Sequence, residues 1–207
     1  MDLDQLLIVD DFYPDPDALR ERALALEYTE PEGLTGFRSP PLHPDGVRER
    51  IEETLGRHLE AWERASEPRG ANGVFFLAFD EGERAEVPGI HWDEPEDFVT
   101  MLVYLTPGLP PDCGTSLWRH RATGLSERPT ADDAAALETS VEALEEAIVA
   151  DAEDRSAWEE IDRIGHVYNR AVFYRAGRLH SATRHHGGAL GEGRIYHSFH
   201  FALGASL

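Results

Sequence analysis

Short apolar segments dominate the second half of the chain. Dense ones occupy residues 74–79 and 98–107, and others follow at 114–120, 169–175 and 194–203. Each is long enough for a strand but short for a helix, and Gly, Pro or polar clusters separate them. Several short strands at this spacing predict an all-β sandwich, a barrel or a jelly roll.

The first third of the chain predicts one strand and two helices. Residues 6–13 are apolar enough for a short strand. Asp15 followed by Pro16 predicts that a helix begins there, because Asp caps helix N-termini and Pro suits the first turn. A second helix is predicted over about residues 45–64. Its apolar face contains Val47, Ile51, Leu55, Leu59 and Trp62.

Residues 127–164 interrupt the series of strands. From Glu127 to Asp162 there are 13 acidic residues and only two arginines. Thr130, with Asp133 three positions later, predicts a helix start. Apolar residues then recur at helical spacing: Ala134, Leu137, Val141, Leu144 and Ile148, with Trp158, Ile161 and Ile164 in a second piece. We predict an acidic, amphipathic helical insertion, which is either a solvated flank or a lid over a site.

Length and composition predict one globular domain over residues 1–207 and leave the oligomeric state open. Hydrophobic residues make up 41% of the chain and aromatic residues 9%, which is enough for a core. No apolar run approaches the ~20 residues that cross a bilayer, so no membrane role is expected. A net charge of −21 disfavours nucleic acid as a partner. The single cysteine, Cys113, and an opening without a basic region predict a cytoplasmic protein without a secretory signal.

His91 and Asp93 form the strongest candidate for a metal site. On extended backbone, residues two apart point to the same side, so both side chains can reach one ion while Trp92 faces away. His180, which follows the strand predicted at 169–175, is the candidate third ligand. Two His and one carboxylate form the facial triad of non-haem Fe(II) oxygenases, in which the opposite face stays open for a cosubstrate and O₂.

Arg194 is the second candidate for chemistry and lies 14 positions after His180. A guanidinium that projects into a barrel needs an anionic partner, because an unpaired buried charge costs several kcal/mol. A protein acid is one possible partner. Together with the metal site we favour 2-oxoglutarate, which chelates iron through its 1-carboxylate and keto oxygen and leaves its far carboxylate for a bidentate cation.

These segments together resemble the 2-oxoglutarate- and Fe(II)-dependent dioxygenases, and among them the small prolyl-4-hydroxylase-like group. The resemblance covers residues 72–120 and 166–203 and, more loosely, the N-terminal third. It implies a mainly β fold, the double-stranded β-helix or jelly roll, with N-terminal helices and the acidic helical insertion between core strands.

The resemblance also implies roles for single residues. His91, Asp93 and His180 take the iron-ligand positions, and Arg194 takes the position that binds the cosubstrate carboxylate. Tyr104 matches a tyrosine that in several relatives donates a hydrogen bond to the same carboxylate, although an ordinary buried aromatic residue is an equal alternative.

The chain departs from the family pattern at two places. Cys113 and Gly114 stand where relatives carry paired glycines, and Tyr196 stands where some carry a serine two positions after the arginine. Ser198 is the next serine along this strand and is a candidate for the cosubstrate site. In related halogenases the carboxylate ligand is missing, so the presence of Asp93 favours hydroxylation.

Three residues at the end of the strand predicted at 114–120 are weaker candidates for binding substrate: Trp118, Arg119 and Arg121. Near the metal they would suit an anionic group, and the alternative is pairing with the acidic insertion. The expected substrate is a small molecule or an amino-acid side chain.

The function predicted from these features is that of an Fe(II)- and 2-oxoglutarate-dependent hydroxylase. It would oxidise an unactivated C–H bond with O₂ while 2-oxoglutarate is decarboxylated to succinate and CO₂. Two alternatives stay open: a non-catalytic jelly-roll binding or regulatory module with a vestigial metal site, and a cupin-like metal enzyme that does not use 2-oxoglutarate. Arg194 separates them, since neither alternative needs a cation at that position.

Overall fold

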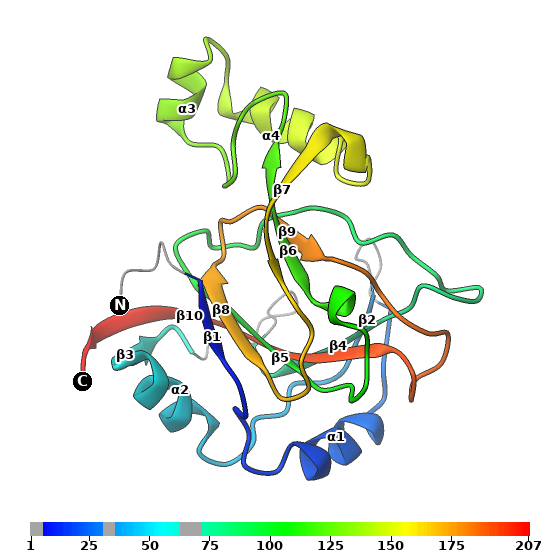
Figure 1. Ribbon diagram of the computed structural model, residues 1–207. Coiled ribbons are helices and arrows are strands. Elements are labelled where there is room, and N and C mark those ends of the chain that lie inside the picture. Colours follow the sequence, from blue (N-terminus) through cyan, green and yellow to red (C-terminus); the bar gives the residue numbers. More distant parts are fainter. Residues whose placement is uncertain (1–5, 31–35, 63–71) are drawn as a thin grey trace.

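Two antiparallel sheets face each other, and helices cover the outer side of the larger one (Figure 1). The computed structural model describes residues 6–30, 36–62 and 72–207. In these residues the larger sheet has the order β1 (Leu7–Val9), β8 (Ala171–Arg175), β5 (Val99–Tyr104), β10 (Arg194–Ser206), β4 (Val74–Ala78) and β2 (Phe37–Arg38), and β3 (Arg57–Glu60) pairs with the far end of β10. The smaller sheet has the order β7 (Trp158–Ile164), β6 (Thr115–His120) and β9 (His180–Ala182).

This mainly β architecture confirms the fold class predicted from the short apolar segments. The strands predicted at 74–79, 98–107, 114–120, 169–175 and 194–203 are β4, β5, β6, β8 and β10. The strand predicted at 6–13 is shorter than expected and ends at Val9, because the chain turns at Asp11, whose φ is 55°. A short 3₁₀ helix, η2 (Pro111–Cys113), leads into β6.

The N-terminal helices are α1 (Pro16–Leu24) and α2 (Val47–Leu55). As predicted, Asp15 caps α1, and its Oδ1 accepts a hydrogen bond from the Ala18 amide at 3.0 Å. The prediction of a helix from 45 to 64 is wrong beyond Leu55. Gly56 ends α2 in the left-handed conformation at a φ of 64°, which favours glycine. Leu59 then reaches the core from β3, and residues 63–64 lie outside the described residues.

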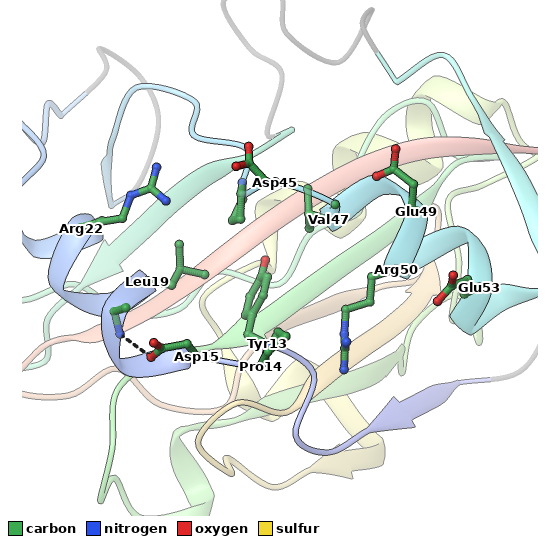
Figure 2. Close-up of a pocket in the computed structure, with 13 residues that line it drawn as sticks. Tyr13, Pro14, Asp15, Leu19, Arg22, Asp45, Val47, Glu49, Arg50 and Glu53 are labelled. Carbon is green, nitrogen blue, oxygen red and sulfur yellow. Dashed lines mark hydrogen bonds between the residues drawn. The ribbon is translucent and has the colours of Figure 1, made fainter.

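The main hydrophobic core lies between α1, α2 and the larger sheet. Leu19 and Ile51 of the helices pack with sheet residues such as Phe75, Phe173 and Phe199, all at most 5% exposed. Burial of each such side chain contributes about 1.5–3 kcal/mol to the stability of the folded state. On this helical side a cavity of about 460 Å³ opens between α1 and α2 beside Tyr13 (Figure 2).

Alternation along β10 separates this core from the space between the sheets. Ile195, Phe199 and Phe201 face the helical core. Arg194 and Tyr196 face the opposite way, towards the smaller sheet, as alternate residues of a strand do. The inner face of the larger sheet therefore carries polar side chains within an otherwise apolar interior, and any site between the sheets is built on it.

The acidic insertion is helical only in its first part. It contains α3 (Ala131–Ala136), α4 (Val141–Ala150) and the 3₁₀ helix η3 (Arg155–Ala157), and Thr130 forms the predicted capping box with Asp133. The second piece, predicted as helical, is the strand β7, which pairs with β6. Figure 1 shows α3 and α4 beyond one end of the smaller sheet. Among the described residues, every helix is too short or too polar to traverse a lipid bilayer.

Candidate metal centre

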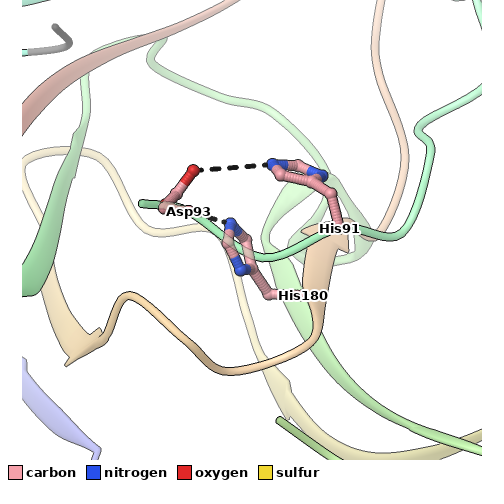
Figure 3. Close-up of side chains that lie close together, drawn as sticks. All are labelled: His91, Asp93 and His180. Atoms are coloured by element: carbon pink, nitrogen blue, oxygen red, sulfur yellow. Dashed lines mark ion pairs between the residues drawn. The ribbon is translucent and has the colours of Figure 1, made fainter. Parts of the chain in front are cut away.

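The side chains of His91, Asp93 and His180 converge on one point (Figure 3). One ligand atom from each lies within 4.8 Å of the other two. Asp93 Oδ1 is 3.8 Å from His91 Nε2, and Asp93 Oδ2 is 3.4 Å from His180 Nε2. Neighbouring ligands of an octahedral ion are about 3 Å apart, given metal–ligand bonds of about 2.1 Å. The distances of 3.8 and 3.4 Å, which end on different oxygens of Asp93, are wider than this spacing, so an ion would draw the three side chains closer together.

Backbone pairing holds the three residues together. His91 and His180 exchange both of their backbone hydrogen bonds, at 3.0 and 2.8 Å. The amide of Asp93 donates to the carbonyl of Ala176 at 2.8 Å, just after β8. The segment 91–93 is therefore fixed along the segment 176–180, and the ligands reach one point although the chain separates them widely.

Hydrogen bonds to the other ring nitrogen orient both imidazoles. Nδ1 of His180 lies 2.8 Å from the carbonyl oxygen of Arg178, and Nδ1 of His91 lies 3.0 Å from that of Gly89. A carbonyl oxygen only accepts, so each Nδ1 carries the proton and each Nε2 presents its lone pair towards Asp93. This support is typical of metal-ligating histidines, whose second nitrogen donates to a carbonyl or a carboxylate.

Asp93 is held by two further side chains of the inner sheet face. Thr100 Oγ1 donates to Asp93 Oδ2 at 2.8 Å, and His200 Nε2 lies 3.4 Å from the same oxygen. Thr100 and His200 are directly opposite each other on β5 and β10. With Oδ2 engaged in this way, Oδ1 is the oxygen left for a metal ion.

The protonation states of Asp93 and His180 suit a divalent cation. Burial raises the pKa of Asp93, but His180 and His200 outweigh burial and bring its pKa below the usual value. Burial lowers the pKa of His180 to about 4, and His180 is therefore neutral at pH 7. Metal ions bind deprotonated ligands, and a carboxylate beside the neutral ring of His180 meets this requirement.

Arg194 lies deep between the sheets, at 1% exposure. Its Nε donates to the carbonyl oxygen of Cys113 at 2.6 Å, and its Nη2 donates to that of Gly114 at 3.1 Å. Its Cζ lies 4.6 Å from the ring centre of Tyr196. Within the described part of the chain no carboxylate lies at ion-pair distance from Arg194, so two neutral carbonyls and an aromatic face leave its charge without an anion.

Several buried polar atoms near Arg194 also have no hydrogen-bond partner among the described residues: Tyr174 Oη, His166 Nε2 and His185 Nδ1. The Tyr174 ring is 4.8 Å from that of His180, and Asp93 and Arg194 both act on its hydroxyl electrostatically. Burial, followed by the charge of Arg194, lowers the pKa of His166 to about 4 and of His185 to about 3, so both are neutral at pH 7. Unpaired buried polar atoms are rare in proteins, and several around one charge are typical of a ligand site.

Tyr104 lies beside Arg194, with its ring centre 5.4 Å from Arg194 Cζ. Its hydroxyl donates to Thr115 Oγ1 at 2.7 Å, and His166 stacks on its ring. Ser198 is buried on the same face of β10 as Arg194, across from Leu102 of β5.

The three weaker substrate candidates have partners of their own. Trp118 packs on the outer side of the smaller sheet, where its Nε1 donates to Ser181 Oγ at 3.0 Å. Arg119 forms an ion pair with Glu159 at 3.2 Å. The Nε of Arg121 donates to the carbonyl oxygen of Trp158. The structure does not bring these side chains to the three metal-site residues. For Arg119 the pairing with the 127–164 segment is the one observed.

The helical insertion contacts the segment that carries His91. The amide of Ile90 donates to the carbonyl of Ala152 at 2.9 Å, and Arg155 donates to the carbonyl of Pro88. Ile148 of α4 is fully buried in a cluster with Ile90 and Trp158. The insertion is thus packed against the backbone beside the metal site.

Sequence reasoning missed Thr100, His200, Tyr174 and the two buried histidines near Arg194. Thr100 lies an even number of residues from Tyr104 on β5, and His200 lies an even number from Arg194 on β10. Strand alternation could therefore have placed both on the inner face. His185 and His186 precede Gly187 and Gly188, a pattern typical of an exposed turn, yet His185 is only 8% exposed.

Solved structures with this fold support the architecture. HygX from Streptomyces hygroscopicus, with nickel, 2-oxoglutarate and hygromycin B bound, superposes at a TM-score of 0.55 with 12% identity over 97% of this chain and 84% of that chain. AviO1 from Streptomyces viridochromogenes Tue57 superposes at 0.53 with 12% identity over 99% and 92%. The chain has the double-stranded β-helix fold of the 2-oxoglutarate-dependent oxygenases, so the predicted resemblance is confirmed at the level of the fold.

The sequence itself matches the model of one protein family. The chain belongs to DUF6445, a family of unknown function, whose model matches residues 2–192. None of the curated proteins compared matches the sequence.

Proposed function

We propose that this protein is an Fe(II)- and 2-oxoglutarate-dependent oxygenase in which His91, Asp93 and His180 hold the iron and Arg194 binds the far carboxylate of 2-oxoglutarate. One observation carries the proposal. A triad of metal-type ligands and a buried arginine without a carboxylate partner occur together between the two sheets of this fold. HygX, which shares the fold, was solved with 2-oxoglutarate and nickel and also with iron.

The residues present fit both groups. Two neutral imidazoles and one carboxylate are the donor set of non-haem Fe(II) sites. Arg194 keeps free N–H donors after its two carbonyl contacts, since a guanidinium has five. The Tyr174 hydroxyl has no hydrogen-bond partner among the described residues and is under the electrostatic influence of both Asp93 and Arg194, so it can donate to a bound keto acid. Bound there, iron and 2-oxoglutarate would supply the activation of O₂ for oxidation of a C–H bond, with 2-oxoglutarate converted to succinate and CO₂.

The protein's own contribution is binding, orientation and exclusion of water. Thr100 and His200 fix one oxygen of Asp93. Leu102, Leu117 and Val172 form an apolar wall between the sheets, which keeps water from the interior. His91 is 56% exposed at its side chain, whereas His180 is 6% exposed, so substrate reaches the metal from the His91 side.

Hydroxylation of a small molecule is the reaction we infer. Asp93 supplies the carboxylate that halogenating relatives lack. The HygX crystal structure also contains the small molecule hygromycin B. A screen of small molecules that follows succinate release, combined with mass spectrometry for a gain of one oxygen atom, tests this part of the proposal.

Anaerobic addition of Fe(II) and 2-oxoglutarate to the purified protein tests the cosubstrate assignment. We expect a visible metal-to-ligand charge-transfer band. Arg194→Lys keeps the charge but loses the bidentate fork, so the 2-oxoglutarate concentration for half-maximal absorbance should rise at least ~10-fold. Arg119→Lys, on the exposed Glu159 pair, is the matched control and should leave the titration unchanged. Folded protein that binds iron but gives no band contradicts the assignment.

A further inference from the structure

One row of side chains crosses the inner face of the larger sheet and ends at Arg38. Arg38 of β2 pairs with Phe76 of β4, Phe76 pairs with Tyr196 of β10, and Tyr196 pairs with Tyr104 of β5. Directly opposite residues in neighbouring strands share a face. Arg38 therefore lies on the same face as Arg194, but on the edge strand of the sheet.

The aromatic residues of this row form a stack with a guanidinium at each end. Arg38 Cζ lies 4.7 Å from the ring centre of Phe76. The rings of Phe76 and Tyr196 are 5.1 Å apart and inclined by only 3°. Arg194 Cζ lies 4.6 Å from the ring centre of Tyr196. The stack holds the Arg38 guanidinium over the face of the Phe76 ring.

Arg38 has no anionic partner among the residues that the structure describes. Its side chain is half-buried, and its Nε is buried without a hydrogen-bond partner in the described residues. No carboxylate of those residues lies within 4 Å of its guanidinium, although the chain has 40 acidic residues. Burial lowers the pKa of Arg38, while Tyr196 and then Asp93 act to raise it. The carboxylate of Asp93 is therefore close enough to act electrostatically on the Arg38 guanidinium.

Three other arginines of the described residues already have partners. Arg119 pairs with Glu159, and Arg184 pairs with Asp80 and Asp112 at 3.7 and 3.5 Å. Arg155 donates to the carbonyl of Pro88. A partly desolvated guanidinium that lacks any such partner gains most from an incoming anion, because charge-assisted, bidentate pairing is strong where water is scarce.

We propose that Arg38 binds an anionic group, a carboxylate or a phosphate, of the small-molecule substrate. This inference rests on the proposed function, because only that function makes the bound molecule a substrate. It limits the expected substrates to molecules that carry a carboxylate or a phosphate. Arg194 serves the cosubstrate, and Arg38 lies on the other side of Phe76 and Tyr196 from it. The cosubstrate carboxylate and the anionic group of the substrate are thus bound by two different arginines on the inner face of the larger sheet.

NMR of the arginine side chains tests the proposal directly. The buried Nε–H of Arg38 is protected from exchange with water and should give a resolved resonance, assigned by its loss in Arg38→Lys. Titration of the metal-free protein with sodium acetate, and separately with inorganic phosphate, should shift this resonance saturably; the stronger of the two identifies the preferred group. Arg84 is the matched control, since it also stacks on an aromatic ring, that of Phe37, but is exposed.

The second arm uses protein loaded with diamagnetic Zn(II) and 2-oxoglutarate. Acetate should still shift the Arg38 resonance, because the cosubstrate occupies Arg194. Arg38→Gln should weaken acetate and phosphate binding, measured at neighbouring backbone amides, at least ~10-fold, and Arg84→Gln should leave it unchanged. The proposal is overturned if the Arg38 resonance moves no more than that of Arg84, or if 2-oxoglutarate itself saturates Arg38 and blocks acetate. Failure of 2-oxoglutarate to bind at all would refute the proposed function, while the metal-free titrations still decide on Arg38.

Discussion

His91 and His180 form a reciprocal backbone pair, in which each amide donates to the carbonyl of the other. The pair places their rings 4.5 Å apart on the same side of the backbone. An isolated β-bridge between His91 and the first residue of β9 therefore helps to set the distance between the two imidazoles. Metal sites built on regular elements are held more precisely than sites on loops.

His180→Ala should abolish tight metal binding without unfolding the protein. In the proposed site His180 is one of three ligands, and its backbone pairing with His91 does not need the side chain. Since even outer partners of ligands are worth 10–100-fold in affinity, we expect a loss above ~100-fold for Fe(II) or Ni(II), measured by isothermal titration. His58→Ala, at an exposed site, is the control. Unchanged affinity in folded His180→Ala would exclude His180 as a ligand.

Thr100→Val should weaken metal binding more moderately. The substitution keeps the branched shape on β5 but removes the hydrogen bond to Asp93 Oδ2, so the carboxylate is less well oriented. We expect a loss of about 10-fold in metal affinity, within the range for outer partners. Thr54→Val removes a hydroxyl on α2, far from the site in the fold, and serves as the control. Equal affinity in both variants would show that Thr100 does not position Asp93.

The sequence predicts those parts of the site that depend on local geometry. The two-residue spacing of His91 and Asp93 is a property of extended backbone, so it could be read directly. The contact of Asp93 with Thr100 and His200 could not, because it depends on how β5 and β10 are aligned, and their residues are about a hundred positions apart. The partner of Arg194 is equally a matter of tertiary structure.

The helix prediction for the segment of Trp158, Ile161 and Ile164 failed for a specific reason. Apolar residues three apart suggest a helix. In β7 a bulge opposite Leu117 and Trp118 leaves Ile161 without a partner. The bulge reverses the alternation, so that Trp158 faces the outer cluster and Ile164 the inner one. An irregular strand thus has the spacing of a helix, and only its pairing with β6 distinguishes the two.

Ile148→Ala should show that α4 is part of the folded structure and not a detached lid. Ile148 is fully buried against Ile90 and Trp158, so its truncation leaves a cavity and should cost about 2–5 kcal/mol in the free energy of unfolding. Val149→Ala, at the next position and 62% exposed, should cost no more than about 0.5 kcal/mol. Denaturant titration measures both. Similar small losses in the two variants would mean that α4 leaves the sheet freely.

The pH dependence of stability should reflect His197 in the helical core. Burial lowers its pKa to about 3, and its ring nitrogens contact Tyr13 Oη and the carbonyl of Leu42. In the unfolded chain this histidine has a pKa of about 6.5. Between about pH 3 and 6.5 it is therefore protonated in the unfolded state but neutral in the folded state. Stability is therefore complete above pH 6.5 and is lost on acidification, by up to about 1.4 kcal/mol per pH unit for this one group.

His197→Gln removes the titrating ring. It should lower stability at pH 7, since it disturbs two buried hydrogen bonds, but the fall between pH 6.5 and 4.5 should be shallower than in the unsubstituted protein. His58→Gln, at a surface site, should keep the original slope. Denaturant midpoints at several pH values give the comparison. Parallel curves for His197→Gln and the unsubstituted protein would show that His197 is protonated in the folded state, and that burial does not control its pKa.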